Sequence, residues 1–273
     1  MSRVFKIGEK DFFFGERTYI MGILNVTPDS FSDGGSFNSI EKAIYHGKEM
    51  INEGVDIIDI GGESTRPGHI EVDEEEEINR VIPVIKALRE ITDIPISIDT
   101  YKSKVAEFAI RAGANMINDV WGFKKDKEMA KVAAKYNVPC CLMHNRDNKN
   151  YNHIITDMTD DLRESINIAL CNGVKKENII LDPGIGFAKD YNDNITVMEN
   201  LEKFSELGYP ILLGTSRKSF IGAILNGIPP VDRVEGTIAT TVIGVMKKCD
   251  IIRVHDVLEN KRAAMVVDAI FRR

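Results

Sequence analysis

The sequence predicts a (β/α)8 barrel, the TIM barrel, because a short apolar run followed by a helical pattern recurs eight times. Strands that alternate with helices pair in parallel, since each parallel pair needs a crossover connection. Eight units in 273 residues give about 34 residues each, close to the repeat of this barrel. The competing architecture is a doubly wound open sheet, which usually has fewer strands and often a G-x-G-x-x-G turn that is absent here. We therefore expect an α/β chain with one barrel domain over residues 1–273.

The elements follow in order along the chain. Residues 1–17 precede the barrel at residues 18–273, and the apolar ends of segment 5–17 around Gly8-Glu9-Lys10 predict a β-hairpin across its N-terminal face. Near-continuous apolar strands indicate a sheet that helices cover on its outer face. The eight strands are expected at residues 18–26, 56–62, 95–100, 116–120, 139–144, 179–183, 210–216 and 251–256.

Helical patterns fill the segments between the strands, as in residues 73–91 and 157–171. The acidic run 71–77 stands at the start of the first of these, where we expect it to complement the helix dipole and to face solvent. The connection 219–248 is interrupted by Pro229-Pro230. It is therefore expected to hold two helices.

Composition excludes several classes of function. A net charge of −7 and a pI of about 5.4 argue against a broad basic surface for nucleic acid. No apolar run approaches the roughly 20 residues of a membrane span, and the first ten residues lack a signal-peptide core. The four cysteines, at 140, 141, 171 and 249, have no C-x-x-C spacing and are expected to be reduced. We therefore expect a cytoplasmic protein with neither nucleic acid nor a membrane as partner.

Polar residues end every predicted strand. Functional side chains of this barrel gather at the carboxyl ends of its strands. The polar residues there are Asn25, Glu63 to Arg66, Asp99, Asn118 with Asp119, His144, Asp182, Thr215 to Lys218, and Arg253 with His255. Any one of them could be a helix cap or a satisfied core group. Eight such strand ends together predict an active site on this face, with His144 facing the site or capping the barrel rim.

The chemistry of these residues divides into two kinds. The cations Arg66, Lys218, Arg253 and His255 indicate an anionic ligand, a phosphate or diphosphate. Short carboxylates and amides, at Asp99, Asn118 and Asp182, suit the donor and acceptor edge of a flat heterocycle. Phe187 would stack on such a ring, although a single phenylalanine more often belongs to the core. These residues predict a ligand with a planar polar head and a phosphorylated end.

Two loops, at residues 27–37 and 61–68, are rich in small and polar residues. They are either plain connecting turns or flaps that close over the reactive site, in which case Asp33, Thr65 and Arg66 are their functional residues. No metal-ligand spacing such as H-E-x-x-H occurs. A Mg²⁺ ion held mainly by diphosphate oxygens would leave almost no trace in the sequence.

Seven segments together closely resemble the bacterial dihydropteroate synthase family. They are MGILNVTPDSFSDGG at 21–35, GGESTRPG at 61–68, SIDTYK at 97–102, INDVWG at 117–122, LDPGIGFAK at 181–189, LLGTSRKSFIG at 212–222 and RVHDV at 253–257. The resemblance implies a TIM-barrel transferase of folate biosynthesis, usually a homodimer and a target of sulfonamides. The reaction it implies joins a 7,8-dihydropterin-6-ylmethyl diphosphate to 4-aminobenzoate, giving 7,8-dihydropteroate and diphosphate. For this reaction we expect a dissociative route with Mg²⁺ as cofactor.

The same resemblance implies a role for each matching residue. The implied pterin pocket consists of Asp99, Asn118, Met143, Asp182, Gly214 and Lys218. The implied diphosphate site consists of Asn25, Thr65, Arg253 and His255, with Asn25 also reaching Mg²⁺. The implied aminobenzoate site consists of Phe31, Thr65, Arg66, Pro67, Phe187, Lys218 and Ser219. The implied catalytic residues are Asp33, Arg66, Asp99, Asp182 and Lys218.

Two other functions fit a pterin-binding barrel. A pterin-dependent methyltransferase also holds its pterin with Asp and Asn side chains, but it needs neither the Arg253 and His255 pair nor the two loop motifs. A non-catalytic paralogue would be expected to lose Lys218 or the loop residues, and all of them are present. The motifs therefore favour the synthase over both.

Overall fold

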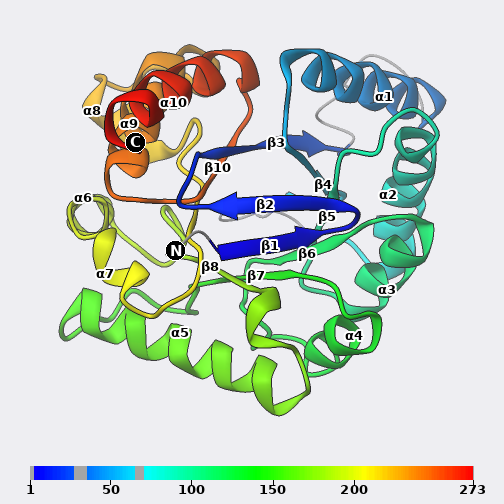
Figure 1. The fold of residues 1–273 in the computed structure, drawn as a ribbon, viewed down its shortest axis with the longest axis horizontal. Helices are drawn as coiled ribbons and strands as arrows, with labels where there is room; N and C mark the ends of the chain where they lie inside the picture. Colours follow the sequence, from blue (N-terminus) through cyan, green and yellow to red (C-terminus); the bar gives the residue numbers. More distant parts are fainter. Residues whose placement is uncertain (1–2, 28–35, 65–70, 273) are drawn as a thin grey trace.

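The computed structural model describes residues 3–27, 36–64 and 71–272, and it shows the expected TIM barrel (Figure 1). Eight parallel strands form one sheet in the order β8-β7-β6-β5-β4-β3-β10-β9. A parallel bridge between Leu181 and Ile211 joins its two edges, so the sheet is nearly closed. The strands are β3 (Tyr19–Asn25), β4 (Ile57–Gly61), β5 (Ile96–Asp99), β6 (Met116–Asp119), β7 (Cys140–Met143), β8 (Ile179–Asp182), β9 (Leu212–Leu213) and β10 (Ile251–Val254).

The side chains of the strands alternate between two cores. Residues such as Ile58, Ile60 and Ile98 point outward and pack against the helices in the larger hydrophobic cluster. The inward-facing cluster forms a floor inside the barrel. It contains Tyr19, Met21, Ile57, Met116, Cys141, Ile180, Leu212 and Ile251. Apart from the inward-facing Ser97 of β5, both faces of the strands are therefore apolar near their starts, which is why the strands read as continuous apolar runs.

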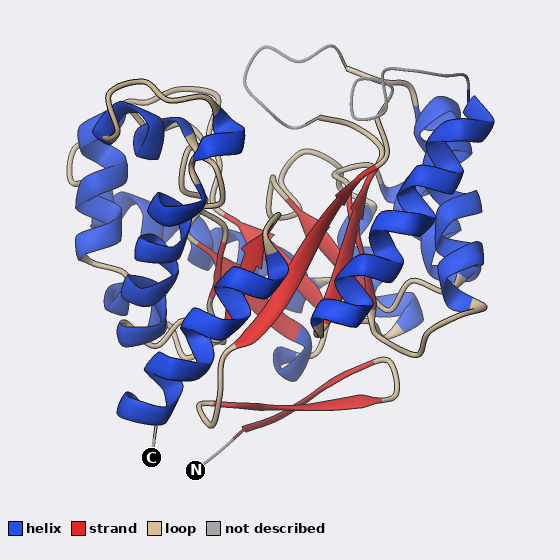
Figure 2. Cartoon of the chain, turned by 90° about the horizontal axis from the view of Figure 1, so that it is seen from above, coloured by secondary structure: helices blue, strands red, loops and turns tan. Residues whose placement is uncertain are grey.

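The predicted N-terminal hairpin is present. It consists of β1 (Arg3–Ile7) and β2 (Lys10–Phe14), which pair antiparallel. Its buried aromatic residues belong to the same cluster as the barrel floor, and the Phe12 and Tyr19 ring centroids are 4.6 Å apart. The hairpin lies across the end of the barrel from which the strands start (Figure 2). It therefore closes that end and leaves the carboxyl ends of the strands as the open face.

Helices surround the barrel on its outer side (Figures 1 and 2). They are α1 (Ser36–Glu53), α2 (Glu74–Arg89), α3 (Ser103–Ala112), α4 (Met129–Tyr136), α5 (Ile154–Cys171), α6 (Tyr191–Glu199), α7 (Glu202–Ser205), α8 (Ser219–Ile224), α9 (Val234–Met246) and α10 (Val257–Phe271). Helices α8 and α9 occupy the connection that was expected to hold two helices. In the described parts of the chain, no helix is long and apolar enough to cross a membrane.

The acidic run begins α2 as predicted, and the Asp73 carboxylate caps the helix by accepting the Glu76 N–H at 2.7 Å. The expectation that the whole run faces solvent is wrong for Glu77. Its side chain is buried and accepts a hydrogen bond from Lys102 Nζ at 2.7 Å. A largely buried lysine partner, supplied by the loop after β5, offsets part of the cost of removing this carboxylate from water, and burial still raises the pKa of Glu77. All four cysteines are free thiols.

Candidate active site

A layer of polar side chains lies directly above the apolar floor of the barrel. Successive side chains of a strand point to opposite faces, so a residue two positions after a floor residue also points inward. The pairs of floor residue and polar residue are Ile57 with Asp59, Met116 with Asn118, Ile180 with Asp182, and Ile251 with Arg253. This two-residue step brings together the predicted Asn118, Asp182 and Arg253, and Asp99 joins them from β5.

Arg253 is the centre of this layer. Its Nε donates to Asp59 Oδ2 and its Nη2 donates to Asp99 Oδ2, each at 2.6 Å. Asn118 Nδ2 donates to the same Asp59 oxygen at 3.0 Å. Burial by itself would lower the pKa of Arg253, but the two carboxylates outweigh burial and raise it. The guanidinium is therefore a fixed positive charge whose planar fork orients two acids from neighbouring strands.

Asp59 is a site residue that the sequence reasoning missed. It stands in the middle of the apolar segment 57–61, whereas functional residues were sought only where strands end. Its side chain is fully buried. Burying an acid inside an apolar strand costs free energy of folding unless the acid has a partner. An aspartate within an apolar run was therefore the sequence signal that could have identified this residue. Among the described residues, Asp59 Oδ1 and Asp99 Oδ1 are buried without a hydrogen-bond partner, so each offers an acceptor to a ligand.

Asp182 and Lys218 form the opposite side of the pocket. Asp182 Oδ1 accepts the Gly184 N–H at 2.7 Å. Burial raises the pKa of Asp182 to about 6, although the Gly184 N–H and Lys218 oppose this shift. Burial lowers the pKa of Lys218 to about 8 against the attraction of Asp182. Both groups therefore sit in a poorly hydrated site, where charge interactions with a ligand are strong.

Lys218 is held against the wall of the pocket. Its Nζ donates to the Ile185 carbonyl oxygen at 2.6 Å and lies 4.1 Å from the centroid of the Phe187 ring. Phe187 packs on an apolar cluster of Tyr101, Val120 and Met143. The predicted residues Met143, Phe187 and Lys218 thus lie together.

Gly214 leaves space beside the charged layer. A Cβ at this position would lie 3.8 Å from Asp182 Oδ2 and 3.9 Å from Arg253 Cβ, which are ordinary contacts. Packing alone therefore does not demand glycine here. A longer side chain would fill the space between Asp182 and Arg253, which is the space a ligand needs.

The other predicted site residues that the structure describes, Asn25, His255 and Ser219, lie at the rim of the barrel. The amide oxygen of Asn25 would lie 3.8 Å from a Cβ at Gly61, and Gly61 pairs in register with Asp99. His255 Nδ1 and Ser216 Oγ are 2.9 Å apart. Ser219 follows Lys218 and begins α8. The predicted residues Phe31, Asp33, Thr65, Arg66 and Pro67 lie outside the described residues.

His144 was expected to face the site or to cap the barrel rim, and of these two alternatives the first is wrong. Met143 points into the pocket, so the next residue points outward toward the helices. His144 Nε2 lies 2.9 Å from Asp161 Oδ2 on α5, and its Nδ1 lies 3.0 Å from Lys189 Nζ. The ring is fully buried behind the pocket wall.

Comparisons with known proteins place this geometry in a family. The model of the pterin binding enzymes matches residues 21–255. The dihydropteroate synthase of Clostridium beijerinckii is 70% identical over 98% of this chain and 100% of its own length. A structure of dihydropteroate synthase from Clostridium difficile in the presence of pteroic acid has a TM-score of 0.94 and 59% identity, covering 96% of this chain and 100% of that one. The Xanthomonas albilineans enzyme with 4-aminobenzoic acid has a TM-score of 0.94 and 39% identity, covering 99% of this chain and 98% of that one.

We predict that His144 makes folding depend on pH. Burial lowers its pKa from 6.5 to about 4, against the opposing effect of Asp161, so the unfolded chain binds a proton that the folded chain does not between these values. The contribution of His144 to stability is therefore complete above about pH 6.5 and is lost as the pH falls toward 4. Its size is about 3 kcal/mol. Urea denaturation of wild type and His144→Gln across this window should show a difference between them that changes with pH.

The matched control for that experiment is His153→Gln, because His153 is exposed. Its stability profile should follow that of the wild type. Parallel profiles for wild type and His144→Gln would show that the buried histidine does not titrate in this way.

Proposed function

Because this chain belongs to the dihydropteroate synthase family of pterin-binding enzymes, we propose that it joins 7,8-dihydropterin-6-ylmethyl diphosphate to 4-aminobenzoate. The products are 7,8-dihydropteroate and diphosphate. The observation that carries the proposal is the buried layer in which Arg253 holds Asp59 and Asp99 while each acid keeps one oxygen without a partner among the described residues. Such a layer provides acceptors for the N–H groups of a flat heterocycle and excludes water from them.

The pterin edge is read by carboxylates and an amide. Asp182 at the end of β8 accepts two parallel N–H bonds from the guanidine-like edge of the ring, since a carboxylate is a pure acceptor. Asn118 both donates and accepts, so it suits the opposite edge, and Asp99 provides its free Oδ1. Lys218 borders the same pocket. The space beside Gly214 admits the ring between Asp182 and Arg253.

The diphosphate lies toward the rim, where Asn25 and His255 stand beside Arg253. Positive charge from Arg253 and hydrogen bonds from His255 stabilise the charge that develops on the leaving oxygen. These residues fit a Mg²⁺ ion that arrives with the diphosphate. The described residues hold no group of three or more His, Cys, Asp or Glu side chains for a metal, so Asn25 Oδ1 would be one ligand among phosphate oxygens and water. When bound, Mg²⁺ supplies further positive charge to the diphosphate oxygens.

The reaction proceeds by a dissociative route. The bond between the pterin methylene carbon and the diphosphate oxygen breaks, and its electron pair leaves with diphosphate. Asp59 and Asp99 bond Arg253, and Asp182 lies near Lys218. Burial raises the pKa of Asp99 to about 7 and that of Asp182 to about 6, and the negative charge that these acids carry in their ionised forms stabilises the cationic methylene. The lone pair of the arylamine then forms the C–N bond, and its nitrogen releases a proton to solvent. No strong base is needed, because this amine is neutral at pH 7.

The acceptor site is expected beside Lys218, Ser219 and Phe187. The roles of Phe31, Asp33, Thr65, Arg66 and Pro67 in this site, in the diphosphate site and in closing the active site remain predictions.

The chain is also proposed to act in the cytoplasm, as its composition suggests. Sulfonamides are expected to compete with 4-aminobenzoate.

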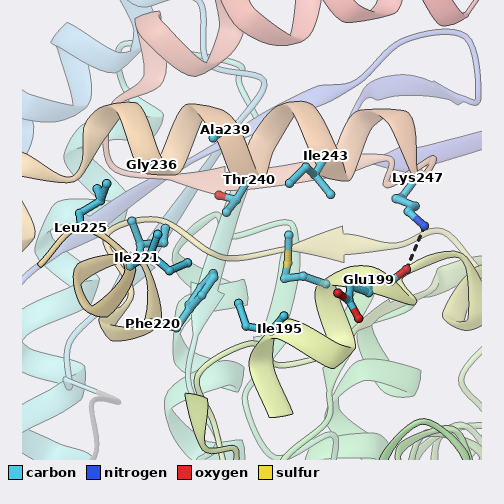
Figure 3. Close-up of a pocket in the computed structure, with 12 residues that line it drawn as sticks. Ile195, Glu199, Phe220, Ile221, Leu225, Gly236, Ala239, Thr240, Ile243 and Lys247 are labelled. Carbon is cyan, nitrogen blue, oxygen red and sulfur yellow. Dashed lines mark hydrogen bonds between the residues drawn. The ribbon is translucent and has the colours of Figure 1, made fainter. Parts of the chain in front are cut away.

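We propose that two copies associate through α8, α9 and α10. Large apolar side chains on these helices are exposed, among them Ile224, Ile243, Met246, Met265, Val266, Ile270 and Phe271. Beside Ile224 and Ile243 lies an apolar cavity of about 530 Å³ between α6, α8 and α9 (Figure 3). A patch of exposed apolar residues this extensive is typical of an interface, and a second copy of the chain is the partner that the family implies.

The test of the function is diphosphate release from the purified protein. Given the pterin diphosphate and Mg²⁺, we expect release that depends on 4-aminobenzoate and yields 7,8-dihydropteroate, and we expect chelation of Mg²⁺ to suppress it. Binding of the pterin diphosphate without release under any condition would identify a binding-only paralogue and overturn the proposal.

Asp182→Asn should weaken binding of the pterin. The amide replaces one acceptor oxygen with a donor, which faces a donor of the pterin edge and leaves both unpaired. The expected loss of affinity is on the order of 100-fold, because an unmet hydrogen bond to a buried charged group is costly. Calorimetry with the pterin diphosphate measures it. Wild-type affinity in this variant would show that Asp182 does not read the pterin edge.

Ile243→Lys should separate the copies. A charge among these exposed apolar side chains is costly to bury in an interface, so we expect the mass in solution to fall from twice 30.6 kDa to 30.6 kDa. Phe108→Lys is the control, since Phe108 is exposed on α3 and outside the patch. Light scattering after gel filtration measures both. A wild-type protein that is monomeric at micromolar concentration would contradict the proposed dimer.

A further inference from the structure

Lys189 is a buried lysine that the reaction described above does not use. Its side chain is only 5% exposed. Its Nζ donates to the carbonyl oxygens of Gly184 and Phe187, each at 2.9 Å, and to His144 Nδ1 at 3.0 Å. An ammonium has three N–H donors, and here all three have an acceptor. Two of the three acceptors belong to the loop that leaves β8.

That loop carries the groups that hold Lys218. The Ile185 carbonyl oxygen accepts from Lys218 Nζ, and the Phe187 ring lies below the same ammonium. Lys189 therefore forms hydrogen bonds with the loop on both sides of Ile185, at Gly184 and at Phe187. The loop packs directly on the end of β7 at Gly184, where φ is +65° and a Cβ would lie 2.1 Å from the His144 carbonyl oxygen, so this position requires glycine.

The other side of Lys189 is anchored to α5. Asp161 accepts from Arg146 Nε and faces His144 Nε2. A proton on Nε2 leaves Nδ1 free to accept from Lys189, which is the neutral form of the ring. Burial lowers the pKa of His144 and that of Lys189, the latter to about 7, so keeping the ammonium charged here carries a cost. A buried charge that makes contacts only with neutral groups is an expensive way to hold a loop unless the loop must be held accurately.

We propose that Lys189 is a positioning residue for the substrate site, because its ammonium fixes the loop of residues 183–188 and thereby places the Ile185 carbonyl and the Phe187 ring against Lys218. The inference rests on the proposed function for its kinetic consequence. The placement of the loop does not depend on that function.

The experiment compares Lys189→Met with the wild type. Methionine has a similar length but no donor, so the loop loses both hydrogen bonds from this side chain while the side-chain volume is nearly unchanged. We expect kcat/KM for the pterin diphosphate to fall roughly 10- to 100-fold, because small displacements of groups that contact substrate have effects of this size. We also expect the amides of residues 184–187 to exchange hydrogen faster in the folded protein, with exchange elsewhere unchanged.

Lys124→Met is the matched control. Lys124 Nζ donates to the Asn145 carbonyl oxygen at 3.2 Å, and among the described residues it has no hydrogen bond to the loop of residues 183–188. It should keep wild-type kinetics and wild-type exchange in the loop. If Lys189→Met does not fold, Lys189→Gln keeps a donor without the charge, and an intermediate loss of kcat/KM is expected.

The outcomes separate the two proposals. Wild-type kinetics and wild-type loop exchange in a folded Lys189 variant would overturn the role of Lys189 and leave the proposed function untouched. A wild-type protein that forms no dihydropteroate would overturn the proposed function, and loop exchange would still decide whether Lys189 fixes the loop. Faster exchange throughout the variant would show a general structural role and would also overturn the inference.

Discussion

The interior of the barrel is divided into an apolar floor and a charged layer, and the division depends on the two-residue repeat of the strands. Floor residues such as Ile57 and Ile251 are followed two positions later by Asp59 and Arg253. Parallel pairing fixes the register of neighbouring strands, with Asp59 opposite Ser97 and Asp99 opposite Asn118, and this register decides which inward side chains come together. A shift of one residue in a single strand would send its charged side chain into the helices and an apolar one into the site.

Burying so many charges in one layer is possible because they compensate one another. Three carboxylates and two cations meet there, and Arg253 bonds two of the carboxylates directly. The compensation is incomplete, since Asp59 and Asp99 each keep an oxygen without a partner among the described residues. Buried polar atoms without partners cost free energy of folding, and they are common where a protein recognises a polar ligand. The hairpin and the floor below are apolar, so the buried charges are confined to the open end of the barrel.

Residues behind the charged layer hold the loops that border the site. The loop after β8 is pinned by Lys189, and Lys189 is anchored through His144 to Asp161 on α5. The acids Glu63 and Glu77 share Lys102 at the ends of the loop after β4. In both places a lysine that is buried or largely buried ties a loop at the open face to the wall of helices. Positions that contact substrate are thereby supported by groups that do not.

The sequence by itself determined the architecture and most of the candidate site. Near-continuous apolar runs with helical patterns between them place the strands, and polar residues at the strand ends identify the open face, because both signals are local. Asp99, Asn118, Asp182, Lys218 and Arg253 were identified from the sequence and meet in the structure. The roles of the loop residues that lie outside the described ranges, Asp33 and Arg66 among them, remain predictions.

Only the tertiary structure decided how these residues are paired. Asp59 was missed because its partner Arg253 is 194 positions away, and no local pattern reveals a bond between strands that distant. His144 and Glu77 were misplaced because their surroundings are supplied by Asp161 on α5 and by Lys102 after β5. The role of Lys189 follows from three acceptors that the fold brings to one point. Local sequence sets which face a side chain occupies, whereas its partners depend on the register and packing of the whole barrel.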